Sequence, residues 1–139
     1  MTTASSSDAD IKDVVYVPDP ERIAAQNDRF RRGVCSNPPA LPVPGPDALR
    51  GRVVFSHAVA ARGLLFTLQC LAAIAAHDTF EVENDPHGEH DFGAVTVEGE
   101  RVWFKIDAYA DDSMQFGSER PDVPLETYRV MTVLFPSDW

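Results

Sequence analysis

The sequence predicts an α+β fold: a small antiparallel sheet of about five strands, with a buried helix packed across it and a peripheral N-terminal helix. Two observations indicate this class. A Leu- and Ala-rich segment, residues 61–77, has the composition of a long helix. Runs of β-branched and aromatic residues before and after it have the composition of strands. With 44% hydrophobic residues among 139, the chain is expected to form one domain with its own core.

The N-terminal part of the chain is predicted to contain one helix. Asp19 is a suitable N-cap, and Pro20 suits the first helical position. Ile23, Asn27 and Phe30 share one face, and because this apolar stripe is thin we expect the helix to pack lightly on the domain. The predicted organisation is a disordered tail over residues 1–18, an N-terminal helix over 19–33, a Pro-rich connector over 34–50 and an α+β core over 51–139.

The predicted core begins with a strand at Gly51. The helix over residues 61–77 is apolar nearly all round, so we expect it to be buried on more than one side, with a dimer interface as the alternative. Residues 79–84 (TFEVEN) alternate between polar and apolar and predict a strand. Further strands are predicted over residues 92–97 and 101–109, which form a hairpin, and over 128–135.

The turn of this hairpin predicts which residues face each other. If Glu98 and Gly99 are its two loop residues, positions whose numbers sum to 197 pair across the strands. Extending that register places His90 beside Asp107. A carboxylate next to a histidine fixes the tautomer of the ring and makes it a better base. The sequence therefore predicts a His90–Asp107 pair.

Charge is distributed unevenly along the chain. Residues 1–77 contain seven acidic and eight basic residues, a net charge of +1, whereas residues 78–139 contain fifteen acidic and four basic residues, a net charge of −11. Such a field repels nucleic acid, so we expect no direct nucleic-acid binding. It attracts cations, or basic protein surfaces that normally hold nucleic acid. The N-terminus lacks the apolar segment of a signal peptide, and the apolar run over residues 64–76 is too short to span a membrane, so a cytoplasmic protein is expected.

The segment NDPHGEHDFG, residues 84–93, concentrates the residue types that carry chemistry. As a metal site, His87 and His90 would supply imidazoles and Glu89, Asp91 or Asp107 a carboxylate, a set that suits zinc or iron. The spacing nevertheless matches neither a zinc-protease helix nor a calcium loop.

A metal-free catalytic site is a second interpretation. His90 would act as a general base oriented by Asp107, with Glu89 nearby. A nucleophile is not evident from the sequence, because Ser56, Ser118 and Cys35 are candidates only by residue type.

A structural turn or a recognition surface is the third interpretation. Asn84 and Asp85 would cap the turn, Pro86 and Gly88 would shape it, and the histidines would bond locally. His57 and His77, each at the end of an apolar element, are interpreted as structural. The predicted recognition surface comprises Glu81, Glu83, Asn84, Asp85, His87, Glu89, His90, Asp91, Glu98, Glu100 and Asp107.

Three stretches of the chain together resemble a known family: NDPHGEHDFG, VWFKIDAY (102–109) and FGSERPDVPLETYRVMTVLF (116–135). In this order they are similar to the small bacterial proteins grouped as domain of unknown function three-seven-six-eight, over roughly residues 20–135. Ala108 stands where members tend to have an aromatic residue, and residues 34–50 look like an insertion. The resemblance marks Asn84, Asp85, Pro86, His87, Glu89, His90, Asp91, Phe92, Gly93, Lys105, Ile106, Asp107, Gly117, Ser118 and Arg129.

The resemblance implies no established activity, but members are common on plasmids and integrated elements of bacteria. It therefore implies an accessory role in mobile-element biology. Together with the acidic second half, it suggests the hypothesis that the protein binds a protein partner and inhibits a nucleic-acid-handling or defence protein. We thus expect a non-enzymatic binding protein without a cofactor, with a metal-dependent hydrolase centred on His87, Glu89, His90 and Asp107 as the alternative. The sequence leaves a homo-oligomer open.

Overall fold

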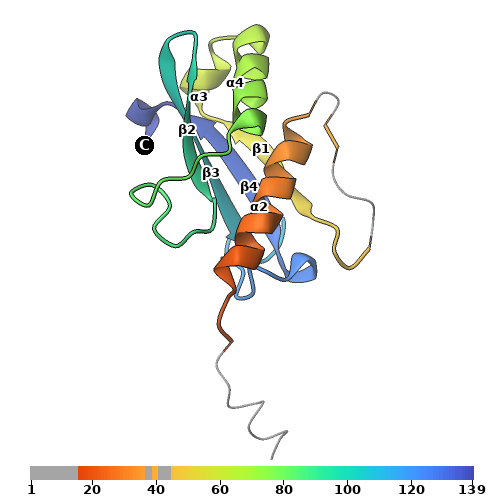
Figure 1. Ribbon diagram of the computed structural model, residues 1–139. Coiled ribbons are helices and arrows are strands. Elements are labelled where there is room, and N and C mark those ends of the chain that lie inside the picture. The colour runs from red at the N-terminus through yellow and green to blue at the C-terminus, as the bar shows by residue number, and fades with distance from the viewer. Residues whose placement is uncertain (1–15, 37–38, 41–44) are drawn as a thin grey trace, which may run out of the picture.

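Four strands form one sheet in the order β1–β4–β3–β2, and helices cover one of its faces (Figure 1). The computed structural model of the protein describes residues 16–36, 39–40 and 45–139. The other positions, which include most of the predicted tail and part of the predicted connector, lie outside the described residues. The helices are α2 (Pro20–Val34), α3 (His57–Ala60) and α4 (Leu64–Ala76), with 3-10 turns η1 (Pro124–Glu126) and η2 (Pro136–Asp138). The strands are β1 (Arg50–Phe55), β2 (Phe92–Val97), β3 (Glu100–Tyr109) and β4 (Tyr128–Leu134).

The α+β class is confirmed, with four strands where about five are predicted. β1 runs parallel to its neighbour β4, while the β3–β4 and β2–β3 pairs are antiparallel, so the sheet is mixed. The hairpin forms with the predicted register, in which paired residue numbers sum to 197. Glu98 and Gly99 both have positive φ angles, 51° and 80°, as a two-residue hairpin turn requires.

The core lies between the sheet and the helices α2 and α4. Alternate residues of β3, namely Val102, Phe104 and Ile106, point toward the helices and are buried. Phe30 of α2 and Ile74 of α4 meet them from the other side. This layer fixes the position of the loop between α4 and β2, which contains the NDPHGEHDFG segment.

The prediction that α2 packs only lightly is wrong. Its first turn is as predicted, since the Asp19 side chain accepts hydrogen bonds from the backbone N–H groups of Glu21 and Arg22 and Pro20 occupies the first helical position. However, Gln26 and Arg31 are buried together with the apolar residues of the helix. The face of α2 that packs on the domain is therefore wider than its apolar residues alone indicate, because it also includes buried polar side chains that have hydrogen-bond partners.

The predicted strand over residues 79–84 is absent. The carbonyl of Glu81 accepts hydrogen bonds from the N–H groups of Asn84 and Asp85, so the segment closes into a turn. Phe80 packs inward on His77 and His90, whereas Val82 is exposed. The alternating pattern therefore reflects one partly buried aromatic residue in a loop and not a pleated strand.

The prediction that α4 is buried on more than one side is also wrong. Phe66, Cys70 and Ile74 face the core, but Leu64 and Leu65 on the other side are exposed. Where the chain is described, none of the helices combines the length and apolar character that a membrane crossing requires.

Candidate functional site

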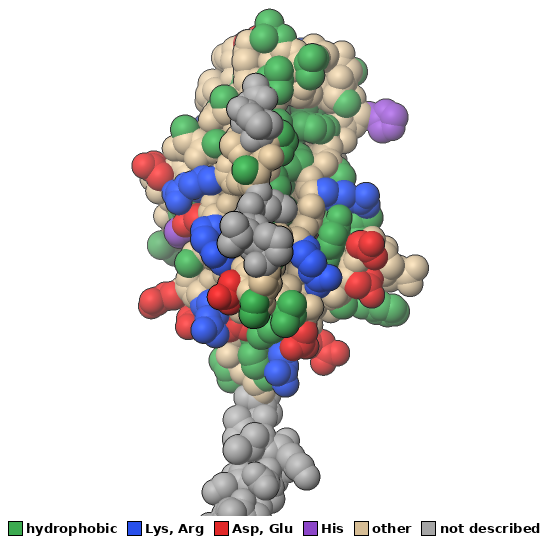
Figure 2. Space-filling view, turned by 90° about the vertical axis from the view of Figure 1, so that its right-hand side faces the viewer, with side chains coloured by type: hydrophobic (Ala, Val, Ile, Leu, Met, Phe, Trp, Pro, Cys, Tyr) green, Lys and Arg blue, Asp and Glu red, His purple; other side chains and the backbone are tan. Residues whose placement is uncertain are grey.

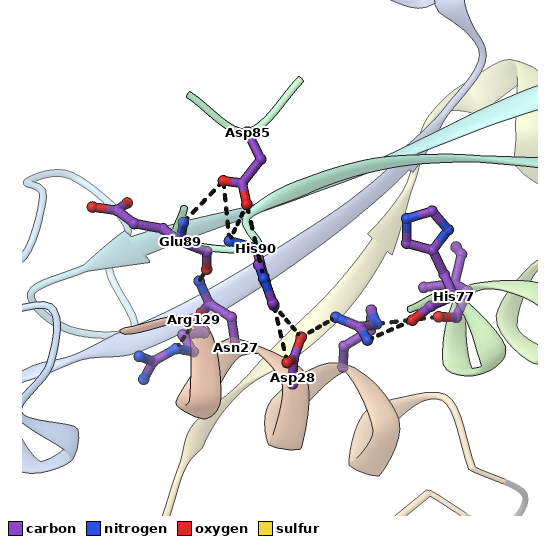
Figure 3. A network of polar contacts seen from close by, with 9 residues as sticks. Asn27, Asp28, His77, Asp85, Glu89, His90 and Arg129 are labelled. Atoms are coloured by element: carbon purple, nitrogen blue, oxygen red, sulfur yellow. Dashed lines mark hydrogen bonds and ion pairs between the residues drawn. The ribbon is translucent and has the colours of Figure 1, made fainter. Parts of the chain in front are cut away.

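Asp85 organises the loop that carries the NDPHGEHDFG segment. Its buried carboxylate accepts hydrogen bonds from the backbone N–H groups of Glu89 (2.9 Å) and His90 (3.2 Å), as Figure 3 shows. Its carbonyl accepts a hydrogen bond from the N–H of Gly88, whose φ angle of +68° suits glycine. Asp85 therefore has the turn-capping role predicted by the structural interpretation of this segment.

His90 contacts α2 and not β3. Its Nδ1 atom lies 3.0 Å and 3.1 Å from the two carboxylate oxygens of Asp28, and its ring stacks on Phe80 with a centroid distance of 3.9 Å. The predicted His90–Asp107 pair is therefore wrong. The ladder begins at Phe92, and the predicted register extends one residue further, where the N–H of Ile106 donates to the carbonyl of Asp91. It ends at His90, whose φ angle of +56° is not that of a strand.

Asp28 connects His90 to a fully buried arginine. Arg31 lies one helical turn further along α2, and its Nη1 atom is 2.7 Å from the Asp28 carboxylate. Its other nitrogens donate to the carbonyls of Ile74 and His77, where α4 ends. We call Asp28, Arg31, Phe80, Asp85 and His90 the histidine cluster; it joins α2, the end of α4 and the loop (Figure 3).

A second buried network holds the other side of the loop. The side chain of Asn27 donates to the carbonyl of Glu89 (2.9 Å) and accepts from Nε of Arg129 (2.8 Å). Arg129 also donates to Gln26 and to the carbonyl of Pro121. Burial lowers the pKa of Arg129 to about 10, which still leaves it charged at neutral pH. Neither Asp28 nor Gln26 was singled out by the sequence, because their partners lie 62 and 103 residues away.

Between these networks and β3 lies a pocket of about 260 Å³. Three carboxylates line it: Glu89 and Asp91 from the loop and Asp107 from β3. Figure 3 shows the Glu89 side chain pointing away from the histidine cluster. We call this space the acidic pocket; its lining also includes Ile23, Asn27, Ser118 and Pro121.

The carboxylates of the acidic pocket are held in an unfavourable environment. Burial, and secondly repulsion from Asp91, raises the pKa of Glu89 above its usual range. Burial also raises the pKa of Asp91, against the opposing effect of a backbone hydrogen bond, and repulsion from Asp85 and Asp107 adds to the rise. Asp107 differs because Lys105 lies 3.0 Å from it. Among the described residues, no ion pair involves Glu89 or Asp91.

The predicted metal ligands are not assembled. His87 is exposed, His90 is engaged by Asp28, and Asp107 lies in the acidic pocket. Across the residues that the structure describes, no three His, Cys, Asp or Glu side chains are grouped so that they could hold a metal ion.

The candidate nucleophiles lie apart from His90. Ser56 bonds to Asp138 near the C-terminus, and Cys35 is buried, which raises the pKa of its thiol to about 12. Ser118 reaches the acidic pocket, but its hydroxyl donates to the carbonyl of Glu126. His77 packs edge-on against Phe80 and Phe104, in line with the structural role predicted for it.

The predicted recognition surface is divided by the structure. Glu98 and Glu100 form ion pairs with Arg62 at the tip of the hairpin. That tip lies about 20 Å from the start of β2, since six residues of a strand cover this length. Glu81 lines a smaller pocket of about 150 Å³ beside His77, and Glu83 is exposed. Only Glu89, Asp91 and Asp107 of the predicted acidic residues converge on one cavity.

The raised pKa values of Glu89 and Asp91 predict a gain in stability when both are neutralised. An acid whose pKa is raised by folding destabilises the folded state as pH increases from the usual carboxyl range through the raised pKa. The Glu89→Gln/Asp91→Asn variant is therefore expected to be more stable than the wild type at pH 7. Because both side chains are partly exposed, the gain is on the order of 0.5 kcal/mol.

Thermal unfolding followed from pH 7 to pH 3 measures this effect. The difference between variant and wild type should shrink as pH falls and disappear once both carboxyls are protonated in either state. A variant less stable than the wild type at pH 7 would show that the two carboxylates make stabilising contacts instead.

A comparison with known families gives one match. The family model described as "Protein of unknown function (DUF3768)" matches residues 55–138, which is more than half of the chain. Neither a curated protein nor a solved structure matches the chain. The match includes the loop and the three carboxylates of the acidic pocket. It begins later than the resemblance over residues 20–135 suggests, so α2, with Asn27, Asp28 and Arg31, precedes it.

Proposed function

The chain belongs to the DUF3768 family of proteins of unknown function, and we propose that it is a small accessory protein that binds a protein partner by accepting a basic side chain in the acidic pocket. One observation carries the proposal. Glu89, Asp91 and Asp107 come from two separate segments, line one cavity, and include two carboxylates, those of Glu89 and Asp91, that form no ion pair among the described residues.

The chemistry of the pocket favours an arginine or lysine side chain. A cation placed between Glu89 and Asp91 would offset the mutual repulsion and the cost of desolvation that raise their pKa values. Guanidinium groups fit carboxylates with two parallel hydrogen bonds. A volume of about 260 Å³ is small for a drug-sized ligand but sufficient for the end of one side chain. Ile23 and Pro121 provide apolar wall for its aliphatic stem.

The charge of the second half of the chain indicates the class of partner. A net charge of −11 over residues 78–139 attracts basic protein surfaces and increases the rate of encounter with them. Basic surfaces of this kind commonly contact nucleic acid in the partner's own function. We therefore propose a nucleic-acid-handling protein as the partner, with inhibition of a host defence nuclease as the specific hypothesis.

The proposal predicts which carboxylates matter for binding. The probe is an arginine-rich peptide, titrated by calorimetry at physiological salt, where the Debye length of about 8 Å weakens long-range attraction. The Glu89→Gln/Asp91→Asn variant is expected to bind the peptide at least about tenfold more weakly. The matched control is Glu98→Gln/Glu100→Gln, which removes the same charge at the hairpin tip and should change affinity by about twofold or less.

Two outcomes separate the pocket from general electrostatics. Equal weakening in both variants would mean that net charge alone attracts the peptide, and the pocket would have no specific role. A second peptide with citrulline in place of arginine should not bind, because it keeps the shape and lacks the charge.

Inhibition of a defence nuclease is tested by plasmid transfer into cells with and without the protein, and equal transfer at saturating expression would exclude that hypothesis.

A further inference from the structure

The outer face of α4 is apolar and is left uncovered by the described part of the chain. Phe66, Cys70 and Ile74 point into the core, whereas Leu64 and Leu65 on the opposite side expose 74% and 70% of their surface. A contiguous exposed apolar patch on a soluble protein commonly marks an interaction site. We call the exposed positions Leu64, Leu65, Leu68, Ala72 and Ala76 the leucine–alanine stripe.

The stripe is continuous and uncharged. Positions 65, 68, 72 and 76 are spaced by three, four and four residues, which places them on one side of a helix. None of the thirteen residues of α4 is charged. In Figure 2, hydrophobic side chains gather over the end of the molecule formed by α3 and α4, while charged side chains lie toward the other end.

We propose that the leucine–alanine stripe is a homodimer interface in which α4 of one copy packs antiparallel against α4 of a second copy. The stripe has its leucines in the first half of α4 and its alanines in the second half. Antiparallel packing about a two-fold axis near Cys70 places Leu65 opposite the partner's Ala76 and Leu68 opposite the partner's Ala72. Large side chains then meet small ones along the whole contact, which is the requirement for close helix packing.

Charge also favours a second copy on this face. Two copies with a net charge of −10 repel each other over most of their surfaces, but the stripe brings no acidic residues together. Arg62, which precedes α4, is directed away from the stripe, since its guanidinium lies over the ring of the core residue Phe66. It also forms ion pairs with Glu98 and Glu100 of its own chain, so the direction of the two helices is set by the leucine and alanine positions alone.

The size of the stripe sets the expected strength. α4 has thirteen residues and is therefore about 20 Å long. One pair of such helices buries less than the roughly 800 Å² per partner of a stable complex, so the dimer is expected to be weak and concentration-dependent. The inference does not rest on the proposed function, since no residue of the acidic pocket belongs to the stripe.

Sedimentation velocity over a series from micromolar to millimolar protein tests the dimer. The wild type should move from the 15.3 kDa monomer toward twice that mass as concentration rises. Leu68→Glu should weaken association about a hundredfold, because it places a charge in the apolar contact. Leu125→Glu, a matched change at a residue 64% exposed outside the stripe, should still dimerise. A wild type that stays monomeric throughout, or equal loss in both variants, would overturn the proposal.

Disulfide cross-linking under mild oxidation tests the direction of the helices. Gln69 flanks the stripe near the two-fold axis, so Gln69→Cys should form a covalent dimer at concentrations where the wild type associates. Ala76→Cys should not, because antiparallel packing separates the two introduced thiols by more than one helical turn along the axis. Native Cys35 and Cys70 are buried and should not contribute. Cross-linking through Ala76→Cys as readily as through Gln69→Cys would contradict the antiparallel arrangement.

Discussion

Replacing Gly51 with alanine is expected to destabilise the protein by about 3 kcal/mol or more, through a clash that no side-chain rotation can relieve. Gly51 of β1 pairs with Arg129 of β4, and a Cβ atom at this position would lie 1.9 Å from the Arg129 carbonyl oxygen. It would also lie 2.6 Å from the ring of Phe30, which is fully buried. Because the nearest atom belongs to the backbone of a central strand, β1 must separate from β4, and the ring of Phe30 must move as well.

Thermal unfolding followed by circular dichroism measures the loss. A domain of this size commonly has a stability of about 5–15 kcal/mol, so the expected loss is a large part of it and corresponds to roughly 10 °C in Tm. The matched control is Gly117→Ala, where the nearest atom to an added Cβ is the Ala108 carbonyl oxygen at 3.8 Å. That variant should unfold close to the wild-type temperature. A small effect at Gly51 would mean that the β1–β4 contact is looser than the pairing indicates.

The parts of the fold that the sequence predicts correctly depend on neighbouring residues. Asp19 and Pro20 identify the start of α2 because an N-cap and a first-turn proline act within three residues. Glu98 and Gly99 identify the hairpin and its register because a two-residue turn leaves only one pairing. Local rules of this kind apply whatever the rest of the chain does.

The incorrect predictions depend on contacts between distant residues. The alternation over residues 79–84 predicts a strand, but Phe80 is held instead by the ring of His90. His90 is predicted to face Asp107, yet its partner Asp28 lies 62 residues earlier on a helix. Nothing in the spacing of either residue reveals the other. The same applies to the parallel pairing of β1 with β4, which joins segments far apart in the chain.

The predictions for the candidate site are partly correct and partly incorrect. Glu89, Asp91 and Asp107 belong to the predicted recognition surface, and the acidic pocket brings these three together. Glu98 and Glu100 belong to the same prediction but lie at the far end of the hairpin with Arg62. Net charge along a chain thus indicates the sign of the charge on a partner's surface. Which carboxylates converge on one cavity depends on how the loop folds back on β3.

Replacing Asp28 with alanine is expected to cost about 3 kcal/mol, because it leaves the fully buried guanidinium of Arg31 without its carboxylate partner. The same change removes both contacts of Asp28 with Nδ1 of His90. Arg31 keeps its bonds to the carbonyls of Ile74 and His77, which limits the loss. Urea unfolding of Asp28→Ala and of the exposed control Asp112→Ala measures the effect, and the control should change stability by less than about 0.5 kcal/mol.

A double-mutant cycle with His90→Ala then separates the contribution of the Asp28–His90 contact. His90→Ala alone is expected to cost about 1.5 kcal/mol, from one charge-assisted hydrogen bond and the stacking on Phe80. If the two side chains act together, the double variant should lose at least about 0.5 kcal/mol less than the sum of the single losses. Such coupling means that His90 fastens the loop to α2, and so holds the backbone from which Glu89 and Asp91 project into the acidic pocket. Additive losses would contradict this role, since His90 would then contribute only through its stacking on Phe80.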